Sequence, residues 1–136
     1  MSHTLFISDL HLSPERPGIN QVFFDFVAGT AARAEFVYIL GDLFEYWVGD
    51  DDLADPFNAS VADALARLSG KGVKLRLMQG NRDVMLGKAF VQRCGAELTA
   101  DPTLLDLHGA RTLIMHGDML CTDDLKYQRF RSWVRY

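Results

Sequence analysis

The sequence has few cysteines, no long hydrophobic run and no signal peptide. Cys94 and Cys121 are the only cysteines among 136 residues and do not form a Cys-x-x-Cys pair, which excludes a disulfide framework. We therefore expect two free thiols in a reducing compartment. No apolar run approaches the roughly 18 residues of a membrane span. The N-terminus also lacks the basic segment that begins a signal peptide.

Positive charge is also scarce. The chain has 14 Lys and Arg against 18 Asp and Glu, a formal net charge of −4, so it has no general attraction for nucleic acid or an anionic membrane. A substrate that carries phosphate would need specific local groups to hold it. No repeat, low-complexity segment or Pro/Gly linker divides the chain, and 49% of its residues are hydrophobic. Residues 1–136 are therefore expected to form a single globular domain.

Short apolar strands alternate with amphipathic helices, which predicts an α/β fold with parallel strands. Strands are expected at residues 5–8, 36–40 and 73–78, and a hairpin at 104–107 and 112–115 around His108-Gly109. Helices are expected at 19–27, from an N-cap at Asn58 to Gly70, at 88–94 and at 124–136. The first helix should place one apolar face on the sheet, made of Ile19, Val22, Phe23, Phe26 and Val27. The second should turn Val61, Leu65 and Leu68 inward.

Polar residues directly follow four of the predicted strands. They are Asp9 and His11, then Asp42 after Gly41, Asn81 after Gly80, and His116 with Asp118. In open α/β sheets, ligands bind at the carboxyl ends of the strands. Each residue alone is more often a turn or capping group, but four sets in the same position along the fold indicate a metal site. Carboxylate, amide and imidazole groups without thiolate suit Mn²⁺, Zn²⁺ or Fe²⁺.

These strings, Asp-x-His, Gly-Asp, Gly-Asn-x-Asp and a later His, resemble the first four motifs of the calcineurin-like metallophosphoesterases over essentially the whole chain. The resemblance implies a sandwich of two mixed β-sheets flanked by α-helices, with two divalent metal ions. It implies that Asp9 and His11 bind the first ion, that Asp42 bridges both, and that Asn81 and His116 bind the second. Such an ion pair, about 3.5–4 Å apart, can clamp a phosphate and activate a water molecule.

Arg82 narrows the resemblance within this family. Many members have a histidine there that is taken to protonate the leaving group, whereas arginine is a poor proton donor and a good bidentate phosphate ligand. Arginine therefore fits a phosphoanhydride, whose leaving phosphate needs little protonation. Together with the longer strings at 7–12, 41–45, 80–83 and 115–124, it makes the sequence similar to the branch that hydrolyses UDP-2,3-diacylglucosamine in lipid A biosynthesis.

The similarity to this branch implies Mn²⁺-dependent attack of water on the α-phosphate, giving UMP and 2,3-diacylglucosamine 1-phosphate. It implies that Asn81, Arg82, Asp124 and Tyr127 contact the nucleotide-sugar lipid substrate. It also implies a cytoplasmic protein that is peripheral on the inner membrane, with no nucleic-acid partner. Between residues 43 and 57, the aromatic cluster Phe44, Tyr46 and Trp47 is expected to pack rather than to touch acyl chains. The acidic residues 50–52 are expected to form a solvated face.

One family motif has no counterpart in the sequence. Members carry a final Gly-His-x-His that completes both metal sites, and none follows His116 before Tyr136. His3 precedes the first strand and His108 lies in the predicted hairpin turn, so neither is expected to substitute. The sequence thus resembles the N-terminal half of such an enzyme, truncated at its C-terminus, and is expected to bind metal weakly with little or no activity.

Three alternatives remain at the level of sequence. The first is a metallophosphoesterase that acts on nucleotides or phosphoproteins. The second is an inactive, truncated metal-binding module. The third is a receiver-like α/β domain, which would be expected to carry a strand-end lysine where this chain has His116.

Overall fold

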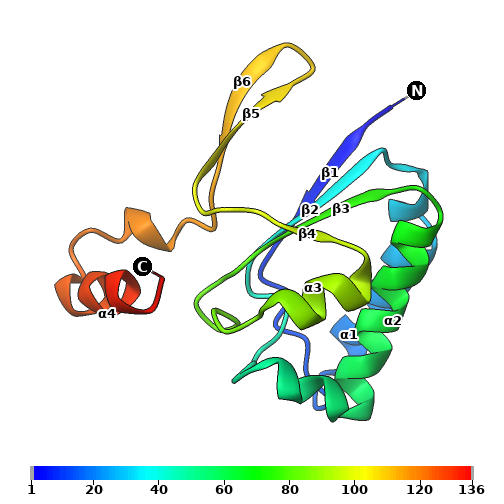
Figure 1. Ribbon diagram of the computed structural model, residues 1–136, viewed down its shortest axis with the longest axis horizontal. Coiled ribbons are helices and arrows are strands. Elements are labelled where there is room, and N and C mark those ends of the chain that lie inside the picture. Colours follow the sequence, from blue (N-terminus) through cyan, green and yellow to red (C-terminus); the bar gives the residue numbers. More distant parts are fainter. Residues whose placement is uncertain (1, 136) are drawn as a thin grey trace.

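The computed structural model describes residues 2–135 as two β-sheets with helices (Figure 1). The larger sheet has the strand order β1-β2-β3-β4, and all of its neighbouring strands are parallel. It contains β1 (Thr4–Ile7), β2 (Phe36–Leu40), β3 (Lys74–Met78) and β4 (Glu97–Leu98). The smaller sheet is an antiparallel hairpin of β5 (Thr103–Leu107) and β6 (Ala110–Ile114). The predicted α/β fold, with its parallel strands and hairpin, is confirmed.

Three of the helices gather on one side of the larger sheet, and the fourth lies apart, beyond the hairpin (Figure 1). They are α1 (Pro17–Ala28), α2 (Pro56–Gly70), α3 (Lys88–Cys94) and α4 (Leu125–Arg135). Short 3₁₀ turns are η1 (Ala31–Arg33), η2 (Asp50–Ala54) and η3 (Asp118–Leu120). The bounds predicted for α3 are correct, and Tyr136, the predicted end of the last helix, lies outside the described residues. None of the helices between residues 2 and 135 has the length and apolarity needed to cross a bilayer.

The two faces of β2 belong to different hydrophobic clusters, because side chains alternate along a strand. Val37 and Ile39 are 1% exposed and join the large core beneath the helices. Tyr38 points the other way and packs with Met78 and with Ile114 of β6. The hairpin is therefore attached to the face of the sheet opposite the helices, and the chain leaves β6 close to the ends of β2 and β3.

The buried face of α1 differs from the prediction at one position. Phe23 and Val27 are buried as expected, but Val22 is 62% exposed. Asn20 is buried instead, because its Nδ2 donates a hydrogen bond to the Ser13 carbonyl at 2.8 Å. The buried face of the helix thus includes Asn20, which is hydrogen-bonded to the preceding loop, and leaves Val22 outside it.

The start of α2 also differs from the prediction. Asp55, not Asn58, is the N-cap: its Oδ1 accepts hydrogen bonds from the backbone N–H groups of Phe57 at 2.9 Å and Asn58 at 3.3 Å. Pro56 then occupies the first turn, where a missing N–H costs nothing. The predicted inward face is confirmed, since Val61, Leu65 and Leu68 are at most 1% exposed, and the helix ends at Gly70 as expected.

The loop between β2 and α2 is only partly as predicted. Phe44 and Trp47 are buried and stack on each other at 4.7 Å, whereas Tyr46 is 70% exposed. Asp50 is not simply solvated: its carboxylate accepts hydrogen bonds from the Trp47 indole and from the backbone N–H of Gly87. The acidic side chain therefore joins this loop to the start of α3.

The two cysteines are both free, as expected. Cys94 is buried at the end of α3, and burial raises the pKa of its thiol to about 12. Cys121 is exposed. Low acidity and burial together make Cys94 a packing residue rather than a nucleophile.

Candidate metal centre

The segments that follow β1 and β2 run side by side and are joined by backbone hydrogen bonds. The N–H of Asp9 donates to the Gly41 carbonyl at 3.0 Å, and the N–H of His11 donates to the Asp42 carbonyl at 3.0 Å. The parallel pairing of the two strands thus continues into the loops. It brings Asp9, His11 and Asp42 to one edge of the sheet, as their positions after the strands predict.

These three residues have an uncommon backbone conformation. The φ angles are +57° at Asp9, +51° at His11 and +54° at Asp42, all in the left-handed region. Side chains other than glycine adopt this region rarely, and such residues concentrate at functional sites. Three of them at adjacent strand ends are independent support for a site at this edge.

The carboxylate of Asp42 lies at the centre of the group. Asp9, Asp42 and His116 each offer a ligand atom, and these atoms lie within 4.8 Å of one another. Asp42 Oδ2 is 3.4 Å from Nε2 of His116 and 3.6 Å from Nε2 of His11. Asp42 therefore has an imidazole on each of two sides, which is the arrangement that a bridging carboxylate requires.

The orientation of His116 is fixed by two contacts from its ring. Its Nδ1 lies 2.7 Å from the Leu40 carbonyl and donates to it, so Nε2 is directed at Asn81 Oδ1, 2.9 Å away, and at Asp42. A backbone acceptor on one ring nitrogen is the usual way in which proteins orient a metal-binding histidine. The hydrogen bond to Asp42 outweighs burial and raises the pKa of His116 to about 9.

Asp42 is almost completely buried and still ionised. Burial would raise its pKa, but the hydrogen bond from His116 and the Arg82 backbone N–H, 2.8 Å from Oδ1, together lower it. The buried negative charge is thus stabilised by hydrogen bonds on one oxygen and by imidazoles near the other. A carboxylate kept ionised in this way is a good cation ligand.

Two glycines make room for this group. A Cβ atom on Gly41 would lie 2.6 Å from Nδ1 of His116, and one on Gly80 would collide with the carboxylate of Asp42. Any larger residue would push the side chains apart. The glycines of the Gly-Asp and Gly-Asn pairs are therefore required for space, which makes these pairs more informative than ordinary turn dipeptides.

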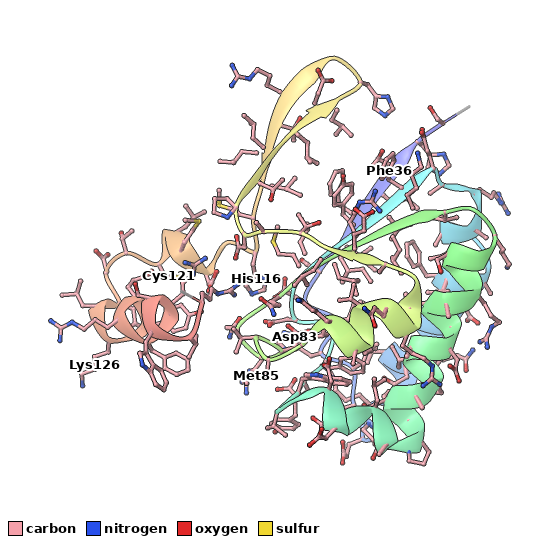
Figure 2. The ribbon with its side chains drawn as sticks, in the orientation of Figure 1. Phe36, Asp83, Met85, His116, Cys121 and Lys126 are labelled. Carbon is pink, nitrogen blue, oxygen red and sulfur yellow. The ribbon has the colours of Figure 1, made fainter. Side chains whose placement is uncertain are left out.

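Two further residues organise the site, and neither has a role in the sequence prediction. Asp83 is 1% exposed, and its carboxylate accepts hydrogen bonds from the backbone N–H groups of Leu43 and Gly80, both at 2.8 Å. Glu45 lies 3.0 Å from His11 Nδ1 and 3.6 Å from the Arg82 guanidinium. The signal for Asp83 was its place at the end of Gly-Asn-x-Asp. Asp83 and His116 lie at the same end of the sheet (Figure 2).

The four residues predicted to contact substrate fall into two groups. Asn81 and Arg82 are exposed beside the metal-ligand candidates. Asp124 and Tyr127 belong to the start of α4, where the Asp124 carboxylate accepts the Tyr127 N–H at 3.0 Å. The Tyr127 hydroxyl donates to the carboxylate of Asp118. Both side chains thus have structural partners.

His108 lies in the exposed turn of the hairpin, as predicted.

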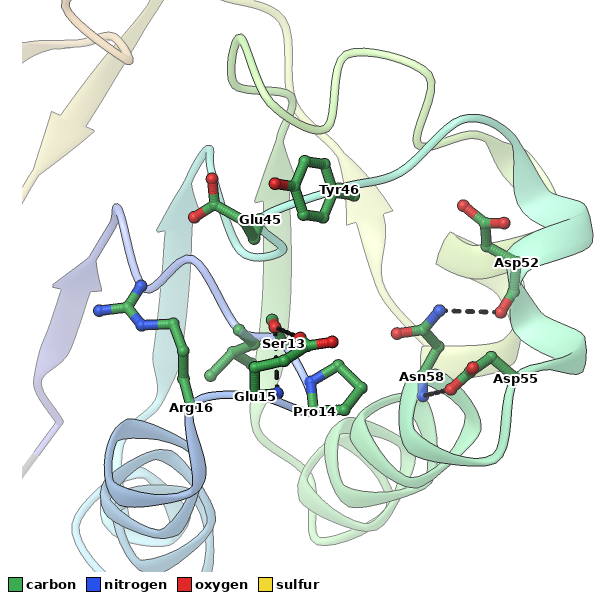
Figure 3. Close-up of a pocket in the computed structure, with 10 residues that line it drawn as sticks. Ser13, Pro14, Glu15, Arg16, Glu45, Tyr46, Asp52, Asp55 and Asn58 are labelled. Carbon is green, nitrogen blue, oxygen red and sulfur yellow. Dashed lines mark hydrogen bonds between the residues drawn. The ribbon is translucent and has the colours of Figure 1, made fainter.

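A cavity of about 670 Å³ is lined by residues that follow β1 and β2 and by the segment at the start of α2 (Figure 3). Its lining mixes polar and apolar surface and carries more negative than positive side chains: Glu15, Glu45, Asp52 and Asp55 against Arg16. Glu45 also contacts His11, so the cavity adjoins the proposed metal ligands.

Residues 2–135 match the sequence profile described as calcineurin-like phosphoesterase. The chain belongs to the calcineurin-like phosphoesterase family. This family implies divalent metal ions, and the carboxylate and imidazole groups at the strand ends of this member fit such ions in chemistry and spacing.

Curated relatives in this family are closely similar to the chain. It is 55% identical over 130 residues to a UDP-2,3-diacylglucosamine hydrolase of Aliivibrio fischeri (strain MJ11), covering 96% of this chain and 54% of that protein. It is 51% identical over 132 residues to a protein of the same name from Xanthomonas campestris pv. campestris (strain B100), covering 97% of this chain and 53% of that protein. The chain thus spans about half the length of the curated relatives it matches.

A crystal structure of the Pseudomonas putida nuclease MPE has a similar fold. The TM-score is 0.56 at 22% identity, over 74% of this chain and 49% of that protein. At this identity the similarity supports the fold and not a shared substrate.

Proposed function

We propose that this chain carries the catalytic metal centre of a UDP-2,3-diacylglucosamine hydrolase of lipid A biosynthesis. The observation that carries the proposal is identity of 50–55% to curated relatives of that name over at least 96% of the chain. Arg82, in the position where many family members have histidine, supports a phosphoanhydride over a phosphomonoester. The proposal concerns the activity of the whole protein.

The proposed metal ligands are the five side chains at the strand ends. Asp9 and His11 would hold one divalent ion, Asn81 and His116 a second, and Asp42 would bridge them; we propose Mn²⁺ for both. When bound, such ions supply polarisation of the phosphate oxygens and a nucleophilic water. The central position of Asp42 supports its bridging role, because its Oδ2 is within 3.6 Å of both imidazoles.

The residues of the chain would hold the diphosphate while water attacks the α-phosphorus. The bond from that phosphorus to the bridging oxygen breaks, which gives UMP and 2,3-diacylglucosamine 1-phosphate. Arg82 would bind the phosphate oxygens, since its side chain is half exposed at the mouth of the site. Asn81 would assist it, and Asp124 and Tyr127 are proposed as further contacts from α4.

The substrate would approach from a membrane surface, because its diacylglucosamine part is a lipid. We place the protein, as a proposal, on the cytoplasmic face of the inner membrane as a peripheral component.

The test is the release of UMP from UDP-2,3-diacylglucosamine by this chain in Mn²⁺, with bis-(p-nitrophenyl) phosphate as a comparison substrate. We expect slow, Mn²⁺-dependent release of UMP that Asp42→Ala reduces at least 100-fold, because that variant loses a ligand of both ions. Arg82→Ala should slow the release of UMP and leave the metal bound. Arg67→Ala, an exposed position on α2, is the control. Hydrolysis of the simple diester alone would favour a different phosphoesterase, and a normal rate in Asp42→Ala would exclude the bridging role.

A further inference from the structure

Two arginines of α4 are buried although the helix lies apart from the larger sheet (Figure 2). The side chains of Arg131 and Arg135 are 6% and 7% exposed. They are four residues apart, so they lie on the same face of the helix. Arginine is almost never buried unless it is paired, and the partners of these two show what that face of α4 contacts.

The partners are two aspartates from different loops. Arg131 places Nε 3.0 Å from Asp118 Oδ2 and Nη2 3.2 Å from Asp101 Oδ2. Arg135 places Nη1 3.3 Å from Asp101 Oδ2 and Nη2 3.6 Å from Asp118 Oδ2. The aspartate side chains are 4% and 8% exposed, so two positive and two negative charges are buried together. We refer to Asp101, Asp118, Arg131 and Arg135 as the arginine–aspartate cluster.

This cluster holds both chain segments that supply the proposed second metal ion with ligands. The other oxygen of Asp101 accepts a hydrogen bond from the backbone N–H of His116 at 3.2 Å. Arg135 Nη1 donates to the carbonyl of Gln79 at 3.1 Å, two residues before Asn81. Each segment thus has a direct hydrogen bond to a buried, charge-paired side chain.

The ligands of the proposed first ion are held differently. Asp9 and His11 are fixed by backbone pairing with the loop after β2, and His11 also contacts Glu45 of that loop. Asp42 is fixed by two backbone hydrogen bonds: its carbonyl accepts from the N–H of His11 in the loop after β1, and its N–H donates to the carboxylate of Asp83. Loss of the arginines should therefore affect the two metal positions unequally.

We propose that the arginine–aspartate cluster is a positioning device for the second metal ion, which keeps His116 and Asn81 in place against Asp42. The inference rests on the proposed two-ion function and adds Asp101, Arg131 and Arg135 as positioning residues. Side chains that hold metal ligands in place typically contribute a factor of about 10–100 to metal affinity.

The experiment is a Mn²⁺ titration of the 136-residue chain followed by calorimetry and by electron paramagnetic resonance, which separates a single Mn²⁺ from a spin-coupled pair. The variants are Arg131→Met and Arg135→Met, with Arg129→Met as the matched control, because Arg129 is exposed on the same helix. Circular dichroism and thermal melting check that each variant is folded. If Arg131→Met does not fold, Arg135→Lys takes its place, since it keeps the charge and loses the planar fork.

We expect the wild-type chain and Arg129→Met to bind a coupled pair, weakly as the sequence predicts, so the titration extends to saturating Mn²⁺. Arg131→Met and Arg135→Met should bind the first ion within about threefold of wild type and the second about 10–100-fold more weakly. Folded variants with unchanged second-ion affinity would overturn the inference, as would equal weakening of both ions, which indicates general destabilisation. A wild-type chain that binds fewer than two ions would overturn the two-ion proposal itself, and the inference with it.

Discussion

Asp83 shows how a single buried carboxylate can set the geometry of a site without being one of its proposed ligands. It accepts backbone hydrogen bonds from Asp42, Leu43 and Phe44 after β2, and from Gly80 after β3. Burial raises the pKa of Asp83, because its negative charge is costly in a buried position. In this position, the hydrogen bonds of Asp83 hold the loops that carry Asp42 and Asn81 at a fixed separation.

Replacement of Asp83 should therefore destabilise the fold. Asp83→Ala would leave buried N–H groups without acceptors, at about 1–3 kcal/mol for each one not reached by water, so we expect a loss of at least about 3 kcal/mol. Asp83→Asn should cost less, because one acceptor oxygen remains. Urea unfolding measures both, with the exposed Asp51→Ala as a control expected within about 0.5 kcal/mol of wild type. A similarly small loss in Asp83→Ala would contradict the proposed role.

His116 should make the stability of the metal-free protein depend on pH. Its folded pKa of about 9 lies above the ordinary value of 6.5, so protonation favours the folded state. The stabilisation is complete below a pH of about 6.5 and is lost as the pH rises through about 9, on the order of 3 kcal/mol in total. Urea unfolding in EDTA at several pH values tests this. His116→Gln should remove this part of the slope, and an unchanged slope in that variant would assign the effect to other groups.

The proposed ligands could be predicted from sequence because each directly follows a strand, and strand ends of a parallel sheet converge. Glu45 and Asp83 could not be given roles in this way. Their roles depend on which backbone N–H groups and side chains the folded loops bring close, and no spacing rule encodes that.

At the scale of elements, the predictions were wrong where a local hydrogen bond determined the structure. The inward face of α2 and the bounds of α3 were predicted correctly, but a side chain that caps a helix competes with others nearby in sequence. Asp55 is the cap of α2 because Pro56 can occupy the first turn, whereas Asn58 already lies inside the helix. Strand β4 was missed because two residues, Glu97 and Leu98, carry no detectable alternation.

The cap of α2 gives a prediction at this scale. Asp55→Ala should lower the free energy of unfolding by about 1 kcal/mol, because the N–H groups of Phe57 and Asn58 lose their acceptor. Asp55→Asn should retain most of the stability, since its carbonyl oxygen can still accept. Thermal or urea unfolding distinguishes the two. Equal losses in both variants would show that charge, not the hydrogen bonds, is what matters.

At the scale of the whole molecule, the site joins two layers of the fold. Strands of the larger sheet are followed by Asp9, His11, Asp42 and Asn81. The hairpin, which packs on the face of that sheet opposite the helices, is followed by His116. The sequence correctly predicted strands before each of these residues. It also predicted the hairpin, but it could not show that the hairpin lies outside the larger sheet, because that depends on the packing of Ile114 against Tyr38 and Met78.

A metal ion that binds residues from both layers should stabilise the fold of both. We expect Mn²⁺ at 100 times its dissociation constant to stabilise the chain by about 2.7 kcal/mol, and to raise its melting temperature accordingly. EDTA should reverse the shift, and Asp42→Asn should abolish it. Ca²⁺, which prefers more oxygen ligands, serves as the matched control. A shift of the same size in Asp42→Asn would place the metal elsewhere.

The left-handed backbone conformation of Asp9, His11 and Asp42 lowers the stability of the fold at positions whose side chains the proposed function needs. Glycine adopts this conformation without steric cost, whereas other residues lose up to about 1–2 kcal/mol at each position. A chain selected only for stability would therefore drift toward glycine at these three positions and lose its side chains there. Engineering that seeks a more robust form of this protein should leave these positions unchanged and look for stability elsewhere in the fold.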